Sequence, residues 1–201
     1  MSGIDWAVAA APLLPDPNDS GDRHVVRPVP GGDLVVVADG IGHGPEAAAA
    51  ARLAIGIAER SGRESPIALL RKCHEELHAT RGAVMSVAFF DHTDRTMTWS
   101  GVGNVEGILL RANSRPGPRR EVLLSRGGVI GHELPALTAM VHGIDAGDTL
   151  AFATDGVRLG FEVDLNEKVP LQALADLILA RHRTGTDDAL VLIARYRGDG
   201  A

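Results

Sequence analysis

Residues 33–50 read DLVVVADGIGHGPEAAAA, in which a run of β-branched residues passes through three glycines into an alanine-rich segment. The run predicts a buried strand, and Pro45 stands at the favoured first position of the helix that follows. Glycines between a strand and a helix are typical of a backbone cradle for phosphate. Asp39, however, lies at the mouth of this turn, and a carboxylate repels phosphate. A cation held between the two would resolve the conflict.

The composition limits the class of protein. The 201 residues fit a single domain, predicted to span 1–201, that can bury a substantial core. Aromatic residues make up 3% of the chain and the net charge is −6, which together argue against nucleic-acid binding. Cys73 is the single cysteine, so neither a disulfide framework nor a thiolate metal cluster is expected. No secretory leader pattern and no apolar run of roughly 18 residues is present, so we expect a cytoplasmic protein without a membrane partner.

The order of the predicted elements indicates the fold class. They are strands at 5–11, 23–29 and 33–39, helices at 45–61 and 66–80, a series of strands between 83 and 154 that includes 120–125 and 137–143, a helix at 168–183 and a strand at 189–196. Strands and helices do not alternate along this order, so a parallel sheet is not expected. The order predicts an α+β domain in which antiparallel sheets are flanked by helices.

Several acidic residues stand at the ends of predicted strands. They are Asp22, Asp39, Asp155, Asp187 and Asp188. If these four strand ends meet at one edge of a sheet, their carboxylates come together, and the repulsion between them is costly unless cations neutralise it. Mg²⁺ and Mn²⁺ prefer oxygen ligands of this kind. Two such ions, about 3.5–4 Å apart, could share a hydroxide that attacks a phosphoryl group in line.

Four motifs, in the same order along the chain, resemble those of the PPM family of metal-dependent serine/threonine protein phosphatases. They are SGD at 20–22, DGIGHGPEAA at 39–48, ATDG at 153–156 and GTDDALVLIARY at 185–196. They are most similar to the SpoIIE-like bacterial branch and, within it, to the stand-alone RsbX-like phosphatases. The resemblance implies an antiparallel β-sandwich of two sheets flanked by α-helices, with two Mn²⁺ or Mg²⁺ ions at one end.

The resemblance also implies roles for individual residues. Asp39 would bridge both ions, and the Gly40 carbonyl would bind one of them. The metal ligands would be completed by Asp22, Asp155 and Asp187, and Asp188 would support them without touching metal.

The activity that the resemblance implies is removal of phosphate from Ser or Thr of a protein, by attack of a metal-bridging water. The implied substrate is a STAS-domain regulator in a bacterial partner-switching pathway that controls a stress response or a sigma factor, as in the stressosome. The sequence itself does not identify this phosphoprotein.

Some basic positions have two or more interpretations. Many family members carry a histidine directly after the Asp-Gly pair, where this chain has Ile41. His43, two residues further on, could act as a general acid, position a water or cap the helix. Arg126, in SRGGVIGH at 125–132, either contacts substrate phosphate or lies in a simple turn. Four arginines form either a solvated hairpin end or a docking site for an acidic partner; they are Arg111, Arg115, Arg119 and Arg120.

Two other functions compete with the phosphatase interpretation. A catalytically silent phosphatase fold that binds a phosphoprotein is expected to lack a metal aspartate, and none is missing here. A nucleotide-binding α/β protein needs the spacing GxGxxG, whereas residues 40–44 have GxGxG and the downstream chain is rich in strands. We expect Asp145 and Asp148, in a turn between two strands, to be structural. His74 and His78, four residues apart on one helix, are expected at the surface.

Overall fold

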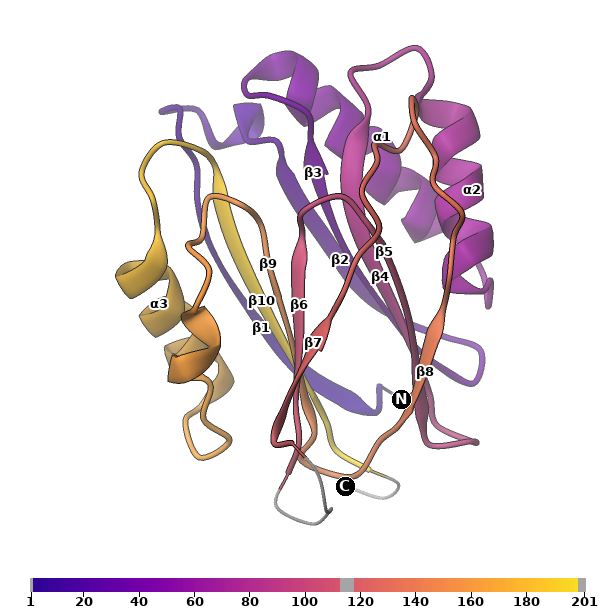
Figure 1. Cartoon of the computed structure of the whole chain (residues 1–201), viewed down its shortest axis with the longest axis vertical. Helices are drawn as coiled ribbons and strands as arrows, with labels where there is room; N and C mark the ends of the chain where they lie inside the picture. Colours follow the sequence, from indigo (N-terminus) through magenta and orange to yellow (C-terminus); the bar gives the residue numbers. More distant parts are fainter. Residues whose placement is uncertain (1, 113–117, 199–201) are drawn as a thin grey trace.

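The computed structural model describes residues 2–112 and 118–198, which form two five-stranded sheets (Figure 1). The order in the first sheet is β1 (Ile4–Ala11), β10 (Ala189–Tyr196), β9 (Thr149–Ala153), β6 (Glu106–Leu110) and β7 (Arg120–Leu123). The order in the second sheet is β2 (Asp22–Val29), β3 (Gly32–Gly40), β4 (Ala83–Asp91), β5 (Thr96–Val102) and β8 (Met140–Gly143). All neighbouring strands are antiparallel, as predicted.

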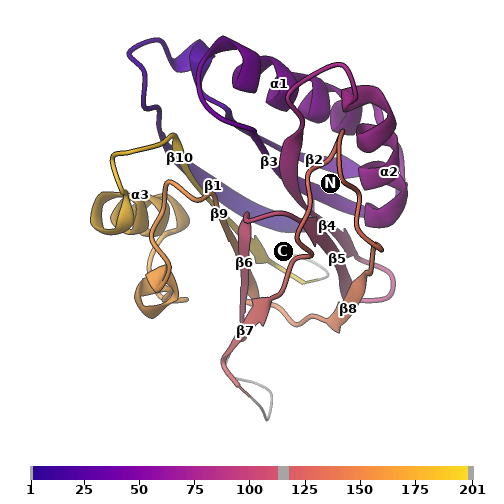
Figure 2. The same cartoon turned by 45° about the horizontal axis from the view of Figure 1, so that its top comes forward.

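Helices cover the two outer faces of this sandwich (Figure 2). The helices α1 (Pro45–Arg60) and α2 (Pro66–Leu77) pack on the second sheet, and α3 (Leu171–His182) packs on the first. Two short 3-10 helices, η1 (Pro17–Asp19) and η2 (Phe161–Asp164), precede β2 and α3. One hydrophobic cluster lies between the sheets and one lies under each helical layer. The predicted fold class is therefore confirmed.

The strand β3 is buried on both faces. Val35 and Val37 belong to the core between the sheets, whereas Val36 and Ala38 pack under the helices. Because both faces are covered, the strand has a continuous apolar run instead of an alternating pattern. Its neighbour β2 is an edge strand of the sheet and contains Pro28, which edge strands tolerate.

The first turn of α1 packs tightly against the end of β3. Pro45 occupies the first helical position, and Glu46 complements the positive end of the helix dipole. A Cβ atom at Gly40 would lie 2.0 Å from the Ala47 carbonyl oxygen, and one at Gly21 would lie 3.3 Å from the Ala47 methyl group. The glycines and the small alanine thus allow the helix to begin directly beside the strand ends that carry the acidic residues.

The sequence and the structure differ mainly at the ends of elements. The helix predicted at 168–183 begins only at Leu171, because its N-cap is Pro170 and the residue before a proline disfavours helical conformation. The strands predicted at 120–125 and 137–143 are shorter, and both lie at sheet edges, where only one neighbour stabilises them. Within residues 2–112 and 118–198, no helix is both long and apolar enough to cross a membrane.

Candidate metal centre

Asp22 and Asp39 lie opposite each other on neighbouring strands. Asp22 is the first residue of β2, Asp39 is next to last in β3, and the antiparallel register pairs them directly. Directly opposite residues project to the same face of a sheet, with Cβ atoms about 5 Å apart. The Gly40 N–H donates to the Gly21 carbonyl oxygen at 3.1 Å beside them. Two carboxylates are therefore placed side by side at one end of the second sheet.

The first sheet supplies the other carboxylates. Asp155 follows β9, and Asp187 and Asp188 precede β10, which is the antiparallel neighbour of β9. A Cβ atom at Gly156 would lie 1.8 Å from the Asp188 carbonyl oxygen, so the two acidic turns touch. The acids were predicted to meet at one edge of a single sheet, and the single sheet is wrong. They come from the strand ends of both sheets, which the sandwich brings together.

Two of these carboxylates are oriented by side chains that the sequence analysis missed. The Thr154 hydroxyl donates to Asp22 Oδ2 at 2.7 Å. The Asn104 amide donates to Asp155 Oδ2 at 2.8 Å. The only signal for Thr154 was its place within the ATDG motif, and Asn104 carried none, since its contact depends on how β6 and β9 pair.

Burial and mutual repulsion disfavour the charged form of this cluster. Burial is the largest cause that raises the pKa of Asp22 to about 7, and the charge of Asp188 adds to it. Burial likewise raises the pKa of Asp39 to about 9, with Asp22 as the strongest neighbouring charge. The pKa of Asp155 is also raised, first by burial and then by Asp187. The hydrogen bonds from Thr154 and Asn104 favour the charged forms of Asp22 and Asp155, but burial outweighs them, so the protein alone does not offset the cost of these charges.

The donor set fits hard divalent cations. Asp22 Oδ1 is buried and has no hydrogen-bond partner. The neighbouring charges that shift the pKa values of Asp22, Asp39 and Asp155 are all carboxylates. Among the described residues, no Lys, Arg or His forms an ion pair with them. Oxygen ligands without a countercharge from the protein are those that Mg²⁺ and Mn²⁺ bind.

The carboxylates do not form a finished ligand cage. Within the described residues, no three acidic, histidine or cysteine side chains stand close enough together to hold an ion as they are. Like charges keep such side chains apart, and binding of an ion is what draws ligands of this kind together. The spacing is therefore consistent with the electrostatics of the cluster.

The Asp188 carboxylate binds backbone groups next to the cluster. Its Oδ1 accepts the Leu13 N–H at 2.7 Å, and its Oδ2 accepts the Gly21 N–H at 2.8 Å. Its own N–H donates to Asp187 Oδ1 at 2.8 Å. Because both carboxylate oxygens hold backbone groups, Asp188 ties the first sheet to the residue that precedes Asp22. This geometry favours the predicted supporting role over direct metal binding.

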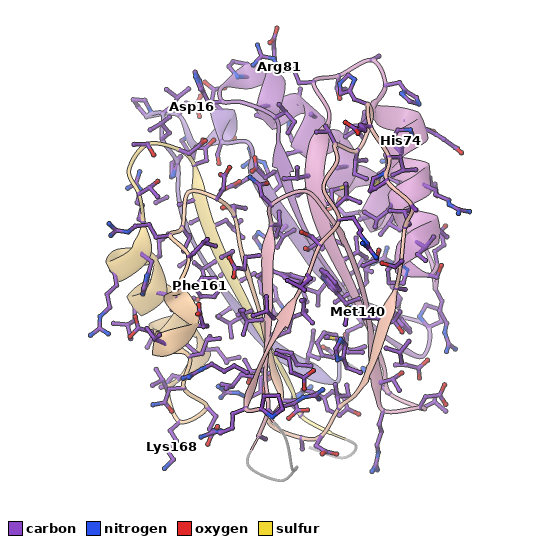
Figure 3. All side chains as sticks on the ribbon, viewed as in Figure 1. Asp16, His74, Arg81, Met140, Phe161 and Lys168 are labelled. Carbon is purple, nitrogen blue, oxygen red and sulfur yellow. The ribbon has the colours of Figure 1, made fainter. Side chains whose placement is uncertain are left out.

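His43 is exposed in the loop between β3 and α1. The N-cap of α1 is Gly44 and no side chain caps this helix, so the helix-capping interpretation of His43 is wrong. The loop is held by the Ile41 N–H, which donates to the Gly82 carbonyl oxygen at 3.0 Å. Arg81, labelled in Figure 3, lies over this loop and pairs with the first turn of α1. A catalytic role for His43 stays a prediction.

Arg126 is exposed in a loop that is anchored beside Asn104. The Arg126 N–H donates to the Gly101 carbonyl oxygen at 3.1 Å, and its own carbonyl accepts the Gly103 N–H at 2.8 Å. Asn104 follows Gly103 directly and donates to Asp155. The loop is thus linked to the carboxylate cluster through a single residue, and the contact of Arg126 with substrate phosphate stays a prediction.

Two histidines hold this same loop at Gly131. His74 Nδ1 accepts the Gly131 N–H at 3.0 Å, and His78 Nδ1 lies 2.6 Å from the Gly131 carbonyl oxygen. The two rings contact edge to face, with centroids 4.6 Å apart. His74 is half-buried, so the expectation that both histidines are merely at the surface is wrong for this one.

We expect the Gly131 amide proton to change its NMR chemical shift as His74 becomes protonated. A protonated Nδ1 carries its own hydrogen and cannot accept the Gly131 N–H. Desolvation lowers the pKa of His74, and His78 lowers it further, while Glu75 opposes the shift and His132 adds to it. Since the folded protein then takes up this proton less readily than the unfolded chain, the contact stabilises the fold above pH ~6.5 and is lost as the pH falls below it. A Gly131 shift that stays constant while His74 titrates would contradict the contact.

The substitution Gly156→Ala is expected to lower the free energy of unfolding by about 3 kcal/mol. The new methyl group would meet the Asp188 carbonyl oxygen, which belongs to backbone and cannot move aside alone. Urea unfolding followed by circular dichroism measures the change. Gly62→Ala is the matched control, because nothing lies within 4 Å of a Cβ atom there. Equal effects of the two substitutions would contradict the close packing of the acidic turns.

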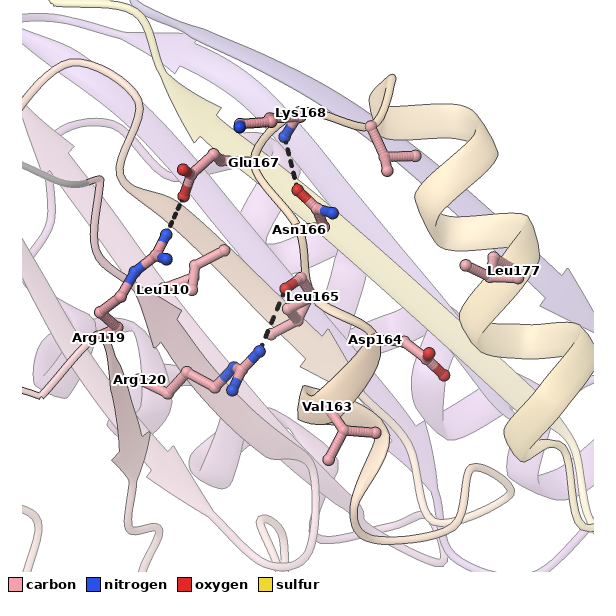
Figure 4. A pocket seen from close by; sticks show the side chains of 11 residues that line it. Leu110, Arg119, Arg120, Val163, Asp164, Leu165, Asn166, Glu167, Lys168 and Leu177 are labelled. Carbon is pink, nitrogen blue, oxygen red and sulfur yellow. Dashed lines mark hydrogen bonds and ion pairs between the residues drawn. The ribbon is translucent and has the colours of Figure 1, made fainter.

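A cavity of about 530 Å³ lies at the other end of the molecule, near Lys168 (Figures 3 and 4). It is formed by η2, the segment that leads to α3, and the ends of β6 and β7. Arg119 pairs with Glu167, and Arg120 donates to the Leu165 carbonyl oxygen at 3.4 Å. The two arginines that line this cavity are therefore held by the protein, and the cavity is remote from the carboxylates.

Arg111 also has acidic partners. It donates to Glu121 at 2.6 Å and to Asp148 at 3.0 Å, and Asp148 further accepts the Ala112 N–H at 2.8 Å. The structural role predicted for Asp148 is confirmed. The contacts of Arg111, like those at the cavity, argue against a docking site for an acidic partner, but the Arg111 side chain is only 12% exposed, so it is not part of a solvated hairpin end either. Arg115 lies outside the described residues.

Known proteins resemble this chain in sequence and in fold. The sequence matches the family model of Stage II sporulation protein E (SpoIIE) over residues 30–197. No curated protein sequence matches the chain.

Solved structures resemble nearly the whole chain. One of these structures comes from a study of the bacterial stressosome as a modular system that has been adapted to control secondary messenger signalling. It is 28% identical to this chain with a TM-score of 0.85, and the match covers 96% of this chain and 99% of that one. RsbX in complex with magnesium is 20% identical with a TM-score of 0.82, over 96% and 94%. The catalytic domain of the serine/threonine protein phosphatase PstP in complex with two manganese ions is 16% identical with a TM-score of 0.70, over 96% and 97%.

The family match covers most of the chain, and the structural matches share its two sheets and their flanking helices. The carboxylate cluster lies within the matched part of the chain, apart from Asp22. The chain therefore belongs to the SpoIIE family and has the fold of the PPM serine/threonine protein phosphatases.

Proposed function

We propose that this protein is a metal-dependent phosphoserine and phosphothreonine protein phosphatase. The observation that carries the proposal is the acidic cluster formed across the two sheets, in which burial and repulsion raise the pKa values of Asp22 and Asp39 without a cation of the protein to offset them. Two Mn²⁺ or Mg²⁺ ions would be held by Asp39 as the shared ligand, by the Gly40 carbonyl oxygen, and by Asp22, Asp155 and Asp187. Solved neighbours with magnesium or with two manganese ions support this assignment.

The reaction adds one water to a phosphate ester. The oxygen of the water forms a bond to phosphorus, the bond from phosphorus to the serine oxygen breaks, and that oxygen leaves with a proton as the hydroxyl. The bound ions would supply a more acidic water and offset the charge of the phosphoryl group.

The residues of the chain position this chemistry. Asp22 and Asp39 are fixed by strand register, and Asp188 holds the backbone before Asp22. His43, exposed in the loop that follows Asp39 and Gly40, is proposed to give the leaving oxygen its proton, and Arg126, exposed in the anchored loop, is proposed to contact the phosphate. Both are tested by replacement with Gln, which retains polarity but removes the titratable or charged group.

The proposed substrate is a phosphorylated STAS-domain regulator of a bacterial partner-switching pathway, acting in the cytoplasm. Structures related to the stressosome, RsbX, and the RsbU and RsbW domains of Rv1364c from Mycobacterium tuberculosis support this choice. The proposal is tested by phosphate release from a STAS-domain protein phosphorylated on serine, with Mn²⁺ present.

A phosphotyrosine peptide is the control for this assay. We expect release from the phosphoserine protein, much slower release from the phosphotyrosine peptide, and none from either after EDTA. Binding of the phosphoserine protein without any release, in the presence of Mn²⁺, would contradict the proposal and identify the catalytically silent binding module instead.

A further inference from the structure

Thr154 connects the two sheets at the carboxylate cluster. It is 1% exposed and lies directly after β9, where the chain leaves the first sheet to form the turn with Asp155. Its hydroxyl donates to Asp22 Oδ2 at 2.7 Å, on the second sheet, and accepts the Leu190 N–H at 2.9 Å, on β10. A single buried hydroxyl therefore has both its donor and its acceptor function in use.

The Thr154 hydroxyl, and not the Thr154 carbonyl, accepts the Leu190 N–H. The Thr154 N–H still donates to the Leu190 carbonyl oxygen at 3.1 Å, as in a regular ladder. The return bond, from the Leu190 N–H, goes to the Thr154 hydroxyl instead of to its carbonyl. This exchange fixes the rotamer of the side chain, because the hydroxyl oxygen has to reach β10 while its hydrogen points to Asp22.

The two oxygens of Asp22 are thereby made unequal. Oδ2 holds the Thr154 hydroxyl, whereas Oδ1 is buried and has no hydrogen-bond partner. The backbone of this region is fixed independently, since Asp188 accepts the N–H of Gly21. The Thr154 contact is therefore not needed to place the strand, but it does set the direction in which the Asp22 carboxylate points.

We propose that Thr154 is a positioning residue that presents Oδ1 of Asp22 to the divalent cation by holding Oδ2. The inference rests on the metal-dependent function proposed above and adds a residue to it. A residue of this kind acts through the ligand that it orients, and loss of such partners weakens metal binding by about 10–100-fold in other proteins.

The test compares Mn²⁺ affinity, measured by isothermal titration calorimetry, in the wild-type protein and three variants. Thr154→Val keeps the branched shape but removes the hydroxyl, and Thr154→Ser keeps the hydroxyl. Thr149→Val is the matched control. Thr149 is a fully buried threonine at the other end of β9, and its hydroxyl also bonds to backbone, to the Gly147 carbonyl oxygen at 3.0 Å.

We expect Thr154→Val to weaken Mn²⁺ binding at least about tenfold, and Thr154→Ser and Thr149→Val to bind as the wild type does. Circular dichroism checks that each variant is folded. If Thr154→Val does not fold, Thr154→Ala replaces it, because the smaller side chain leaves room for a water to reach Leu190 and Asp22.

Three outcomes overturn the inference, and the failure of the inference alone is distinguishable from failure of the metal centre. If the wild type binds Mn²⁺ and the variant without the hydroxyl binds it equally well, Thr154 has no positioning role, although the metal centre stands. The same holds if Thr149→Val weakens binding as much as Thr154→Val does. If the wild type binds no Mn²⁺, the proposed metal centre fails and the inference fails with it.

Discussion

The substitution Asp39→Asn is expected to lower the rate of phosphate release by at least about a thousandfold, which corresponds to about 4 kcal/mol of transition-state stabilisation. An effect of this size is expected because Asp39 is the carboxylate that both ions would share, and ions of this kind contribute several kcal/mol to phosphoryl transfer. Asn has the same shape, and its side chain can still accept one hydrogen bond. The loss would therefore report on charge and not on packing. Phosphate release with Mn²⁺ present measures the effect.

The same substitution is expected to make the metal-free protein more stable, by about 1–2 kcal/mol at pH 8. Burial, and then repulsion by the neighbouring carboxylates, raise the pKa of Asp39 to about 9. Because the folded state then holds this proton more tightly than the unfolded chain does, the stability of the wild type falls as the pH rises between about 4 and 9. Asn carries no charge, so the advantage of the variant grows over the same range.

Urea unfolding at pH 5 and pH 8, with EDTA present, measures this difference. Asp94→Asn is the control, because Asp94 is exposed in the turn between β4 and β5, away from the cluster. A variant that is inactive and also less stable than the wild type at pH 8 would contradict this account, since it would indicate that Asp39 stabilises the fold.

Removal of divalent ions is expected to have the second large effect. Ligand binding to the folded state alone adds about 2.7 kcal/mol when the free ion is a hundredfold above its dissociation constant. For a chain of this length, that is a rise of about 5–10 °C in Tm. Mn²⁺ should therefore raise the Tm of the wild type, and EDTA should reverse the change.

Differential scanning calorimetry measures this shift, and Asp39→Asn is the comparison. The variant should show a much smaller shift, because the shared ligand is gone. Calorimetric titration of the wild type should give two bound ions per chain. A Tm that does not respond to Mn²⁺ or Mg²⁺ would contradict the cation-binding interpretation of the cluster, whatever the activity of the protein.

The sequence predicted most of the fold because its strongest patterns are local. Strand β3 and helix α1 follow from a continuous apolar run, a set of glycines and Pro45, each of which acts within a few residues. The weakly patterned strands β7 and β8 were predicted too long, because their length depends on a single neighbouring strand. Pro170 shortens α3 at its N-terminal end, whereas the predicted helix extended past this proline.

The acids of the candidate site were predictable from their places at strand ends, but their surroundings were not. Thr154 meets Asp22 across 132 positions of the chain, and Asn104 meets Asp155 across 51. The first contact depends on how the two sheets face each other and the second on how β6 and β9 pair, and no short pattern specifies either. The same is true of the Gly131 loop, where His74 looked like a surface residue because its partner is 57 positions away.

The central claim is that the acidic cluster binds divalent ions that carry out phosphate-ester hydrolysis. Its most direct test is the rate of p-nitrophenyl phosphate hydrolysis by the wild-type protein in Mn²⁺, then in excess EDTA, and then with Mn²⁺ restored. The account predicts turnover in the first and third conditions and none in the second. Turnover that persists at the same rate in EDTA would contradict it.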